Sequence, residues 1–180
     1  MKFTLTAAFV STILLGVTAL PQPDALRLQR RTCDFPTVPL LRAYSPSATD
    51  HFYTTNASEM KNAVTNLGFH KEGNAAIVHP DQTPITIPLY RLYSPSATDH
   101  FYTTSAGERD NAAKNLGFVK EGIAAYVYET QLCDTVPLYR MYSPSAKDHF
   151  YTTNAAEKDN AVNKLGYTYE GIAAYVNPQP

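Results

Sequence analysis

The chain has 180 residues, with 15 Lys and Arg against 16 Asp and Glu, and its formal net charge is −1. This balance lacks the basic footprint of a nucleic-acid-binding protein. The length suits a single domain that is large enough to bury a hydrophobic core without a structural metal. We expect no metal and no other cofactor.

The first 31 residues have the composition of processing segments. Lys2, the apolar run around Phe9–Leu15 and the small residues Val17–Ala19 indicate a secretory signal peptide over residues 1–19. Residues 20–31 end in the dibasic pair Arg30-Arg31, which is typical of a cleaved propeptide, although a solvated charge pair is the alternative. The apolar run is too short to cross ~30 Å of hydrocarbon. We therefore expect an extracellular, secreted protein, residues 32–180, without a membrane anchor in the mature chain.

Two cysteines, Cys33 and Cys133, open two matching segments of the mature chain. In an oxidising compartment, the simplest interpretation of such a pair is a disulfide. It would join the entries to the first and third of the repeats described next.

One motif occurs three times: Tyr-Ser-Pro-Ser-Ala-(Thr/Lys)-Asp-His-Phe-Tyr-Thr-Thr. The copies start 49 residues apart and lie at Tyr44–Thr55, Tyr93–Thr104 and Tyr142–Thr153. Similarity continues on both sides, from a Pro-Leu-(Leu/Tyr)-Arg entry to a closing Glu-Gly-(Asn/Ile)-Ala-Ala-(Ile/Tyr)-Val. The repeats cover about 38–80, 87–129 and 136–178, within a single domain, 32–180.

The second repeat illustrates the predicted elements. Alternation over Leu89–Tyr93 predicts a strand, and Ser94–Asp99 has turn chemistry. His100–Thr104 predicts a second strand because it is rich in aromatic and β-branched residues, and Phe101 is the expected core residue.

A helix is predicted after the second strand. Ser105 can cap it, Glu108 stands where a capping box needs an acid, and Gly117 ends it. Two short strands follow, Phe118–Gly122 and Ile123–Tyr128, with Gly122 at the bend between them.

Four strands in each of three repeats predict a mainly β fold with short helices. A β-trefoil-like closed threefold arrangement is the first expectation, because repeats of this kind bury a common core that none could bury alone. The alternative is a small propeller-like ring of three four-stranded units, although typical propellers have at least four blades.

The motifs Tyr-Arg-(Leu/Met)-Tyr, His-Phe-Tyr-Thr-Thr, Leu-Gly-(Phe/Tyr) and Glu-Gly-Ile-Ala-Ala-Tyr resemble a family of extracellular repeats of unknown function. Its members occur in secreted fungal proteins and as accessory modules of bacterial cell-wall hydrolases. The resemblance covers residues 38–178. It implies a module that often lies beside glycan-cleaving domains, and it implies no catalytic residue.

Each repeat carries an aromatic and polar set that could contact a sugar, because sugars need an aromatic face together with planar donors and acceptors. In the second and third repeats the set is Arg91, Tyr93, Asp99, His100 and Tyr102, and Arg140, Tyr142, Asp148, His149 and Tyr151. In the first repeat it is Arg42, Tyr44, Asp50, His51 and Tyr53. The competing interpretation is that the same residues form the scaffold, since all three copies share it.

The first repeat lacks two aromatic residues of the others. Leu41 stands where the others have Tyr90 and Tyr139, and Ile77 where they have Tyr126 and Tyr175. If these tyrosines bind sugar, the first repeat is the weakest site. If they only pack, nothing follows for binding.

Metal binding and catalysis are weaker hypotheses. Neighbouring residues on a strand face opposite sides, so one Asp-His pair cannot chelate an ion, although the three repeat histidines could meet at an axis. Asp99 and Glu121 could act as paired carboxylates on a glycosidic bond, but three equivalent active sites would be unusual. We predict no metal site and no enzyme.

Three further residues stand apart from the repeat pattern. Asn56-Ala57-Ser58 is an N-glycosylation sequon at a predicted helix cap, where capping and glycosylation would compete for one side chain. His70 and His79 occur in the first repeat alone and are expected at the surface.

The sequence thus predicts a non-catalytic, secreted, lectin-like protein that binds glycans or cell-wall polysaccharide at two or three equivalent sites. The alternative is a secreted inhibitor or effector that presents the loop His79–Ile87 to a protein partner.

Overall fold

The computed structural model describes residues 33–179. The predicted signal peptide and propeptide lie outside the described residues. Within the described part, each repeat forms one three-stranded antiparallel sheet and one helix. Among residues 33–179, none of the helices combines the length and hydropathy that a membrane span requires.

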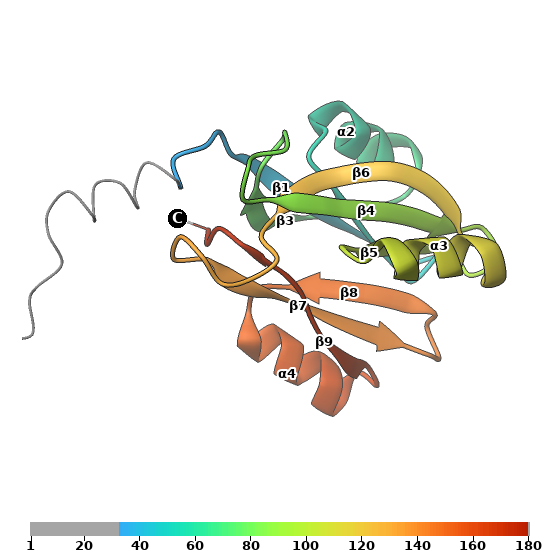
Figure 1. Cartoon of the computed structure of the whole chain (residues 1–180). Helices are drawn as coiled ribbons and strands as arrows, with labels where there is room; N and C mark the ends of the chain where they lie inside the picture. Colours follow the sequence, from blue (N-terminus) through green and yellow to red (C-terminus); the bar gives the residue numbers. More distant parts are fainter. Residues whose placement is uncertain (1–32, 180) are drawn as a thin grey trace, which may run out of the picture. The chain divides into compact units, whose positions relative to one another are not determined.

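The first repeat contains β1 (Val38–Ser45), β2 (Asp50–Thr54), α2 (Ala57–Asn66) and β3 (His70–Val78). The second contains β4 (Ile87–Ser94), β5 (Asp99–Thr103), α3 (Ala106–Asn115) and β6 (Val119–Val127). The third contains β7 (Val136–Ser143), β8 (Asp148–Thr152), α4 (Ala155–Lys164) and β9 (Thr168–Val176). Each sheet places the first strand of its repeat in the middle. Each helix lies beside the sheet of its own repeat (Figure 1).

The fold is mainly β with a threefold repeat, as predicted, but the number of strands and the way the sheets close differ from the prediction. The described residues contain nine strands in three separate sheets that close no barrel, so a β-trefoil is not confirmed. The two strands predicted on either side of Gly122 form one strand, β6. Gly122 lies inside it with φ +111°, where the register shifts.

Two register shifts in β6 explain how one strand replaces two. The pairing with β4 passes from Ala125 to Ile123 and then from Gly122 to Lys120, leaving Ala124 and Glu121 as bulged residues. Bulges bend a strand and turn a side chain in a new direction. β3 and β9 shift at the equivalent positions. The Ala124 carbonyl accepts a hydrogen bond from the Thr55 hydroxyl of the first repeat, at 3.2 Å.

The predicted helix signals are confirmed at both ends. The Ser105 hydroxyl accepts a hydrogen bond from the Glu108 N–H, and Asn56 and Asn154 cap α2 and α4 in the same way. Gly117 adopts φ +77°, which lets the Phe118 N–H bond the Ala112 carbonyl at 3.2 Å. The capping box is incomplete, because the Glu108 side chain turns to Thr103 and to the third repeat.

Three tyrosines, one on each of the edge strands β2, β5 and β8, form the centre of the main core. Tyr53, Tyr102 and Tyr151 are each about 1% exposed, and their rings meet edge to face with centroids 5.3–5.5 Å apart. Each hydroxyl binds the backbone of the next tyrosine. That of Tyr102, for example, donates to the Tyr53 carbonyl at 2.7 Å and accepts from the Tyr53 N–H at 2.8 Å. Each hydroxyl thus bonds one N–H and one carbonyl on the free edge of β2, β5 or β8, where no further strand is paired.

The ends of β3, β6 and β9 close the ring on one side of the core. Three isolated bridges join the repeats in turn: His79 with Tyr126, Tyr128 with Tyr175, and Asn177 with Ile77. Three similar sheets around a common core agree with the predicted threefold repeat, with three strands per unit instead of four.

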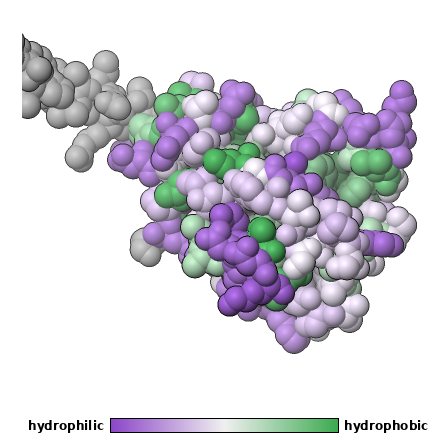
Figure 2. Space-filling view, turned by 90° about the horizontal axis from the view of Figure 1, so that it is seen from below, coloured by the Kyte–Doolittle hydropathy of each residue, from purple (hydrophilic) through white to green (hydrophobic). Residues whose placement is uncertain are grey.

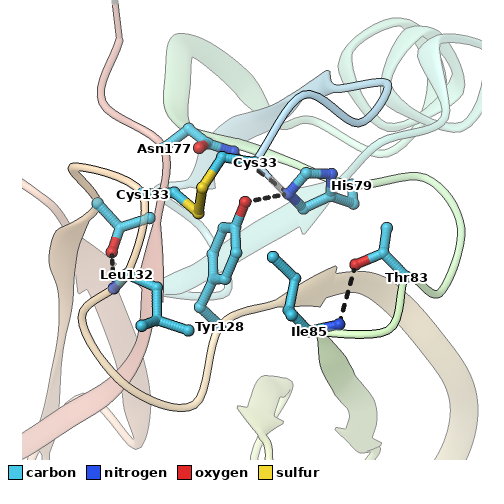
Figure 3. Close-up of a disulfide and its surroundings, with 9 residues drawn as sticks. Cys33, His79, Thr83, Ile85, Tyr128, Leu132, Cys133 and Asn177 are labelled. Atoms are coloured by element: carbon cyan, nitrogen blue, oxygen red, sulfur yellow. Dashed lines mark hydrogen bonds between the residues drawn. A yellow bond between two sulfur atoms is a disulfide. The ribbon is translucent and has the colours of Figure 1, made fainter. Parts of the chain in front are cut away.

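The predicted disulfide is confirmed beside this end of the core. Cys33 and Cys133 are bonded across 100 residues, with their Cα atoms 5.6 Å apart. His79 lies nearby and is 1% exposed, so the expectation of a surface histidine was wrong (Figure 3). Its ring contacts the Pro36 carbonyl and the Tyr128 hydroxyl, both at 3.0 Å, and these partners explain its burial. His70 is exposed, as expected.

The tyrosine ring gives a first testable prediction. Tyr102→Phe keeps the packed ring but leaves the buried N–H and carbonyl of Tyr53 without a partner. We expect the free energy of unfolding to fall by about 1–3 kcal/mol, measured by chemical denaturation. Tyr93→Phe, which changes a half-buried tyrosine on the adjacent strand, is the control and should cost much less. Equal losses in the two variants would contradict the central role of the hydroxyl ring.

Candidate binding clefts between the repeats

Each buried aspartate of the motif binds the histidine of the next repeat. The Asp50 carboxylate lies 2.7 Å from His100 Nδ1 and accepts the His100 backbone N–H at 2.9 Å. Asp99 holds His149, and Asp148 holds His51, with the same pair of contacts. All three aspartates are at most 2% exposed. The motif therefore connects the repeats into a closed ring.

The aspartates, and not the histidines, meet near the common axis. Carboxylate oxygens of Asp50, Asp99 and Asp148 lie within 4.8 Å of one another. Both oxygens of each carboxylate already accept a hydrogen bond from a histidine, which compensates for the burial of their charge. The idea that three repeat histidines meet at the axis was wrong, since each lies at an interface between two repeats.

An arginine spans each interface beside the histidine. The terminal nitrogens of Arg91 donate to Glu59 of the first repeat at 3.1 and 2.9 Å. Arg91 Nε forms an ion pair with Glu121 of its own repeat at 2.8 Å. The guanidinium carbon stands 5.4 Å from the centre of the Phe52 ring. Arg140 joins Glu108 and Glu170, and Arg42 joins Glu157 and Glu72, in the same arrangement.

Partial burial alone would raise the pKa of Glu59, but hydrogen bonds from Arg91 and Thr54 lower it below the ordinary value. The pKa of Glu108 and that of Glu157 are lowered by the same balance. Burial opposes the charge of Arg91, yet the bond to Glu59 raises its pKa overall. These arginine–glutamate pairs therefore stay charged at neutral pH.

Three equivalent clefts open above these pairs, one at each interface. The first is lined by Phe52, Glu59, Asn62, Ala63, Leu67 and Phe69 of the first repeat and by Arg91, His100 and Glu121 of the second. The second is lined by Phe101, Glu108, Asn111, Ala112, Leu116, Phe118, Arg140, His149 and Glu170. The third, between the third and first repeats, is lined by Arg42, His51, Glu72, Phe150, Glu157, Asn160, Ala161, Leu165 and Tyr167. Their volumes are about 200, 230 and 200 Å³.

The structure divides the predicted sugar-binding set into two groups. The arginines and histidines reach the clefts, and the half-buried Tyr93 lies beside one, its ring 4.7 Å from that of His100. Tyr102 and Asp99 are 1% exposed and are occupied with neighbouring repeats. The expectation that every member of the set contacts the ligand was therefore wrong for the buried members. These belong to the scaffold: Tyr53, Tyr102, Tyr151, Asp50, Asp99 and Asp148.

Sequence reasoning missed most of the cleft lining. Each cleft contains an exposed asparagine of the helix and the exposed leucine that directly follows the helix: Asn62 and Leu67, Asn111 and Leu116, Asn160 and Leu165. Their shared spacing of 49 residues was visible in the sequence, but a polar helix position gives no sign of which neighbouring repeat it faces.

The third cleft differs from the others at one wall. Tyr167 replaces Phe69 and Phe118, and its hydroxyl donates to Asp148 at 2.5 Å. A second hollow of about 400 Å³ shares His51, Glu72, Leu165 and Tyr167 with this cleft and is also lined by Tyr44, Ser143, Ser145 and Ala146. The third cleft therefore continues into a longer groove.

Packing explains why the first repeat has Leu41 where the others have Tyr90 and Tyr139. The Arg109 guanidinium lies over Tyr90 at 4.3 Å in the second repeat. Lys158 stands over Tyr139 in the third repeat at 5.4 Å. In the first repeat the equivalent pair is Leu41 with the buried Met60, which pack together. An apolar pair thus replaces a cation–aromatic pair, and nothing follows for binding at the clefts.

The residues weighed as paired carboxylates lie at different interfaces. Asp99 binds His149, between the second and third repeats, whereas Glu121 lines the first cleft beside Arg91. Asp99 is also buried, so these two carboxylates do not share a cleft.

The loop proposed to meet a protein partner begins at the buried His79. Within it the Thr83 N–H donates to the Thr86 hydroxyl at 2.8 Å, and Thr86 is 4% exposed. The loop, which borders the disulfide region (Figure 3), is thus partly built into the domain.

Fold and clefts together define a threefold repeat module in which every interface between repeats carries the same charged and aromatic cleft. The chain belongs to the family described as DUF5648, a domain of unknown function, whose model matches residues 39–177. Comparison with curated proteins and comparison with solved structures gave no match.

The lowered pKa values of the interface glutamates predict a pH dependence. A carboxylate whose pKa is lower in the folded state stabilises the fold above its ordinary pKa, 4.5, and this contribution is lost as the pH falls below it. Glu108→Gln should cost about 1 kcal/mol at pH 7, since solvent screens a side chain that is 39% exposed. This deficit relative to the unmodified protein should shrink between about pH 5 and pH 3, as measured by denaturant unfolding at each pH.

The exposed Glu129, outside the clefts, provides the control for this series through Glu129→Gln. Its unfolding curve should follow that of the unmodified protein at every pH. A deficit of Glu108→Gln that stays constant down to pH 3 would show that its charge pairing with Arg140 does not contribute to stability.

Proposed function

We propose that this chain is a secreted carbohydrate-binding protein with three equivalent sites at the clefts between its repeats. One observation carries the proposal: the same combination of side chains recurs at three open clefts. Each cleft joins an apolar wall to planar polar groups, such as Leu67 and Phe69 with Asn62 and Glu121 in the first. This is the combination that the C–H face and the hydroxyls of a sugar need.

The size of the clefts fits small, weakly held units of a larger ligand. At about 200 Å³, the first cleft is smaller than the ~300–1,000 Å³ of sites that enclose a drug-sized molecule. One sugar ring at a time suits such a space. Three linked sites make weak binding useful, because engagement of one raises the effective concentration at the others.

The surface and the disulfide are compatible with this role. The disulfide and the lack of a membrane-spanning helix among the described residues agree with a secreted protein. Exposed apolar residues occur as small separate groups on the face shown in Figure 2, with polar residues between them. That face thus offers no broad apolar surface of the kind that often marks a protein interface.

The test uses the exposed cleft asparagines, because substitution of the buried tyrosines would disturb the core. The triple variant Asn62→Ala, Asn111→Ala and Asn160→Ala removes one amide from each cleft and introduces a good helix former. We expect the processed protein to bind oligosaccharides on a glycan array that includes chitin and peptidoglycan fragments. The triple variant should bind at least about tenfold more weakly, which corresponds to about 1.4 kcal/mol.

A matched control changes the same helices outside the cleft lining. The variant Thr65→Ala, Lys114→Ala and Asn163→Ala alters three equivalent exposed positions and should keep full binding. Absence of binding to every glycan would reject the proposal and favour a protein partner. Equal losses in the two triple variants would place the binding site outside the clefts.

A further inference from the structure

The clefts contain many acceptors and few free donors. All three nitrogens of Arg91 are turned to carboxylates, the terminal pair to Glu59 and Nε to Glu121. Each cleft therefore contains two glutamates and one arginine that is already paired. An added anion would meet excess negative charge, and the guanidinium that could attract it is already shared between two carboxylates.

The cleft histidine lies beside the same glutamate. His100 Nδ1 lies 2.7 Å from the Asp50 carboxylate, and Nε2 of the same ring lies 3.8 Å from Glu121 Oε2. His51 with Glu72 and His149 with Glu170 repeat this arrangement at 3.8 and 3.9 Å. Three carboxylates, Asp50, Glu59 and Glu121, thus surround Arg91 and His100 at the first cleft, and a cationic group that donates several hydrogens suits their surplus of negative charge.

We infer that the clefts select amino sugars, whose primary ammonium donates to the glutamate while the ring lies against the leucine wall. This inference rests on the proposed carbohydrate binding. A primary ammonium offers three donors and a positive charge, and a hydroxyl offers one donor and no charge. Neutral sugars should thus bind more weakly, and sugars with a carboxylate more weakly still.

The experiment compares three oligosaccharides of equal length by calorimetry: glucosamine, N-acetylglucosamine and galacturonic acid. The expected order of affinity is amine, then neutral, then acid, with at least about a tenfold gap between the first two. The triple variant Glu72→Gln, Glu121→Gln and Glu170→Gln should remove this gap, because the amide attracts the ammonium no more than it attracts a neutral donor. Glu129→Gln, outside the clefts, should keep the full preference.

The outcomes separate failure of the inference from failure of the proposed function. No binding of any sugar would reject the proposed function, and this inference with it. Equal or stronger binding of the neutral or acidic sugar would overturn the inference alone. A polylysine of matched charge serves as the other source of ammonium groups, and binding as tight as that of the amino sugar would show recognition of charge without the sugar ring.

A separate observation concerns Asn56, the cap residue of α2. Its Oδ1 accepts the backbone N–H groups of Ser58 and Glu59 at 2.9 and 3.1 Å. N-glycosylation modifies the other amide atom, Nδ2, and no hydrogen bond from Nδ2 is present among the described residues. Asn56 is exposed. The expected competition between capping and glycosylation therefore does not arise, because the two use different atoms.

We propose that Asn56 carries an N-linked glycan while its Oδ1 continues to cap α2. The chain contains a matched comparison in Asn154, which caps α4 with the same pair of contacts but is followed by Ala155 and Ala156. The two caps share their backbone conformation, with φ −87° and −85°. They differ in the hydroxyl residue that the glycosylation motif requires.

Mass spectrometry of the protein secreted from a eukaryotic host tests this site. We expect a glycan on Asn56, none on Asn154, and a second glycan on Asn154 in the Ala156→Ser variant. Ser58→Ala should lose the first glycan and keep the melting temperature within about 1 °C, whereas Asn56→Ala should lower it by about 3 °C through loss of the cap. An unmodified Asn56 would overturn the proposal. A glycosylated form that melts as low as Asn56→Ala would show that the glycan displaces the cap.

Discussion

The structure depends on one constraint: the buried aspartates and central tyrosines of each repeat find hydrogen-bond partners on the neighbouring repeats. Asp50 meets its hydrogen-bond donors only on the second repeat, at His100, and the backbone of Tyr53 is completed by the hydroxyl of Tyr102. An unpaired buried carboxylate or amide costs far more than an average contact contributes. A single repeat would leave most of these groups unpaired, so the polar network favours assembly together with the apolar core.

The clefts follow from the same constraint. Arg91 must cross an interface to reach Glu59, and the bulge in β6 turns Glu121 toward the same guanidinium. These residues hold the repeats together while their edges remain open to solvent. The scaffold and binding interpretations of the motif therefore apply to different members of one set: the tyrosines and aspartates of the core on one side, the arginines and histidines of the clefts on the other.

Local structure could be predicted from the sequence because its signals are local. Ser105 and Gly117 mark the ends of α3 through chemistry that acts within one helical turn, and Phe101 follows from strand alternation. The bulges in β6 could not be predicted, because a glycine inside an apolar run marks a bend and a bulge equally well. The contacts between repeats could not be predicted either, since they depend on which repeat each motif residue faces.

The matching interfaces have a consequence for how such a chain can be built. Asp148 and Glu157 of the third repeat bind the first repeat just as Asp50 and Glu59 of the first bind the second. These contacts are therefore the same whether or not the two repeats follow each other in the chain. The architecture is that of a homotrimer whose subunits are joined by two linkers, residues 79–86 and 128–135. The Cys33–Cys133 bond ties the segment before the first repeat to the second of these linkers. Circular permutation at either linker would therefore preserve every interface.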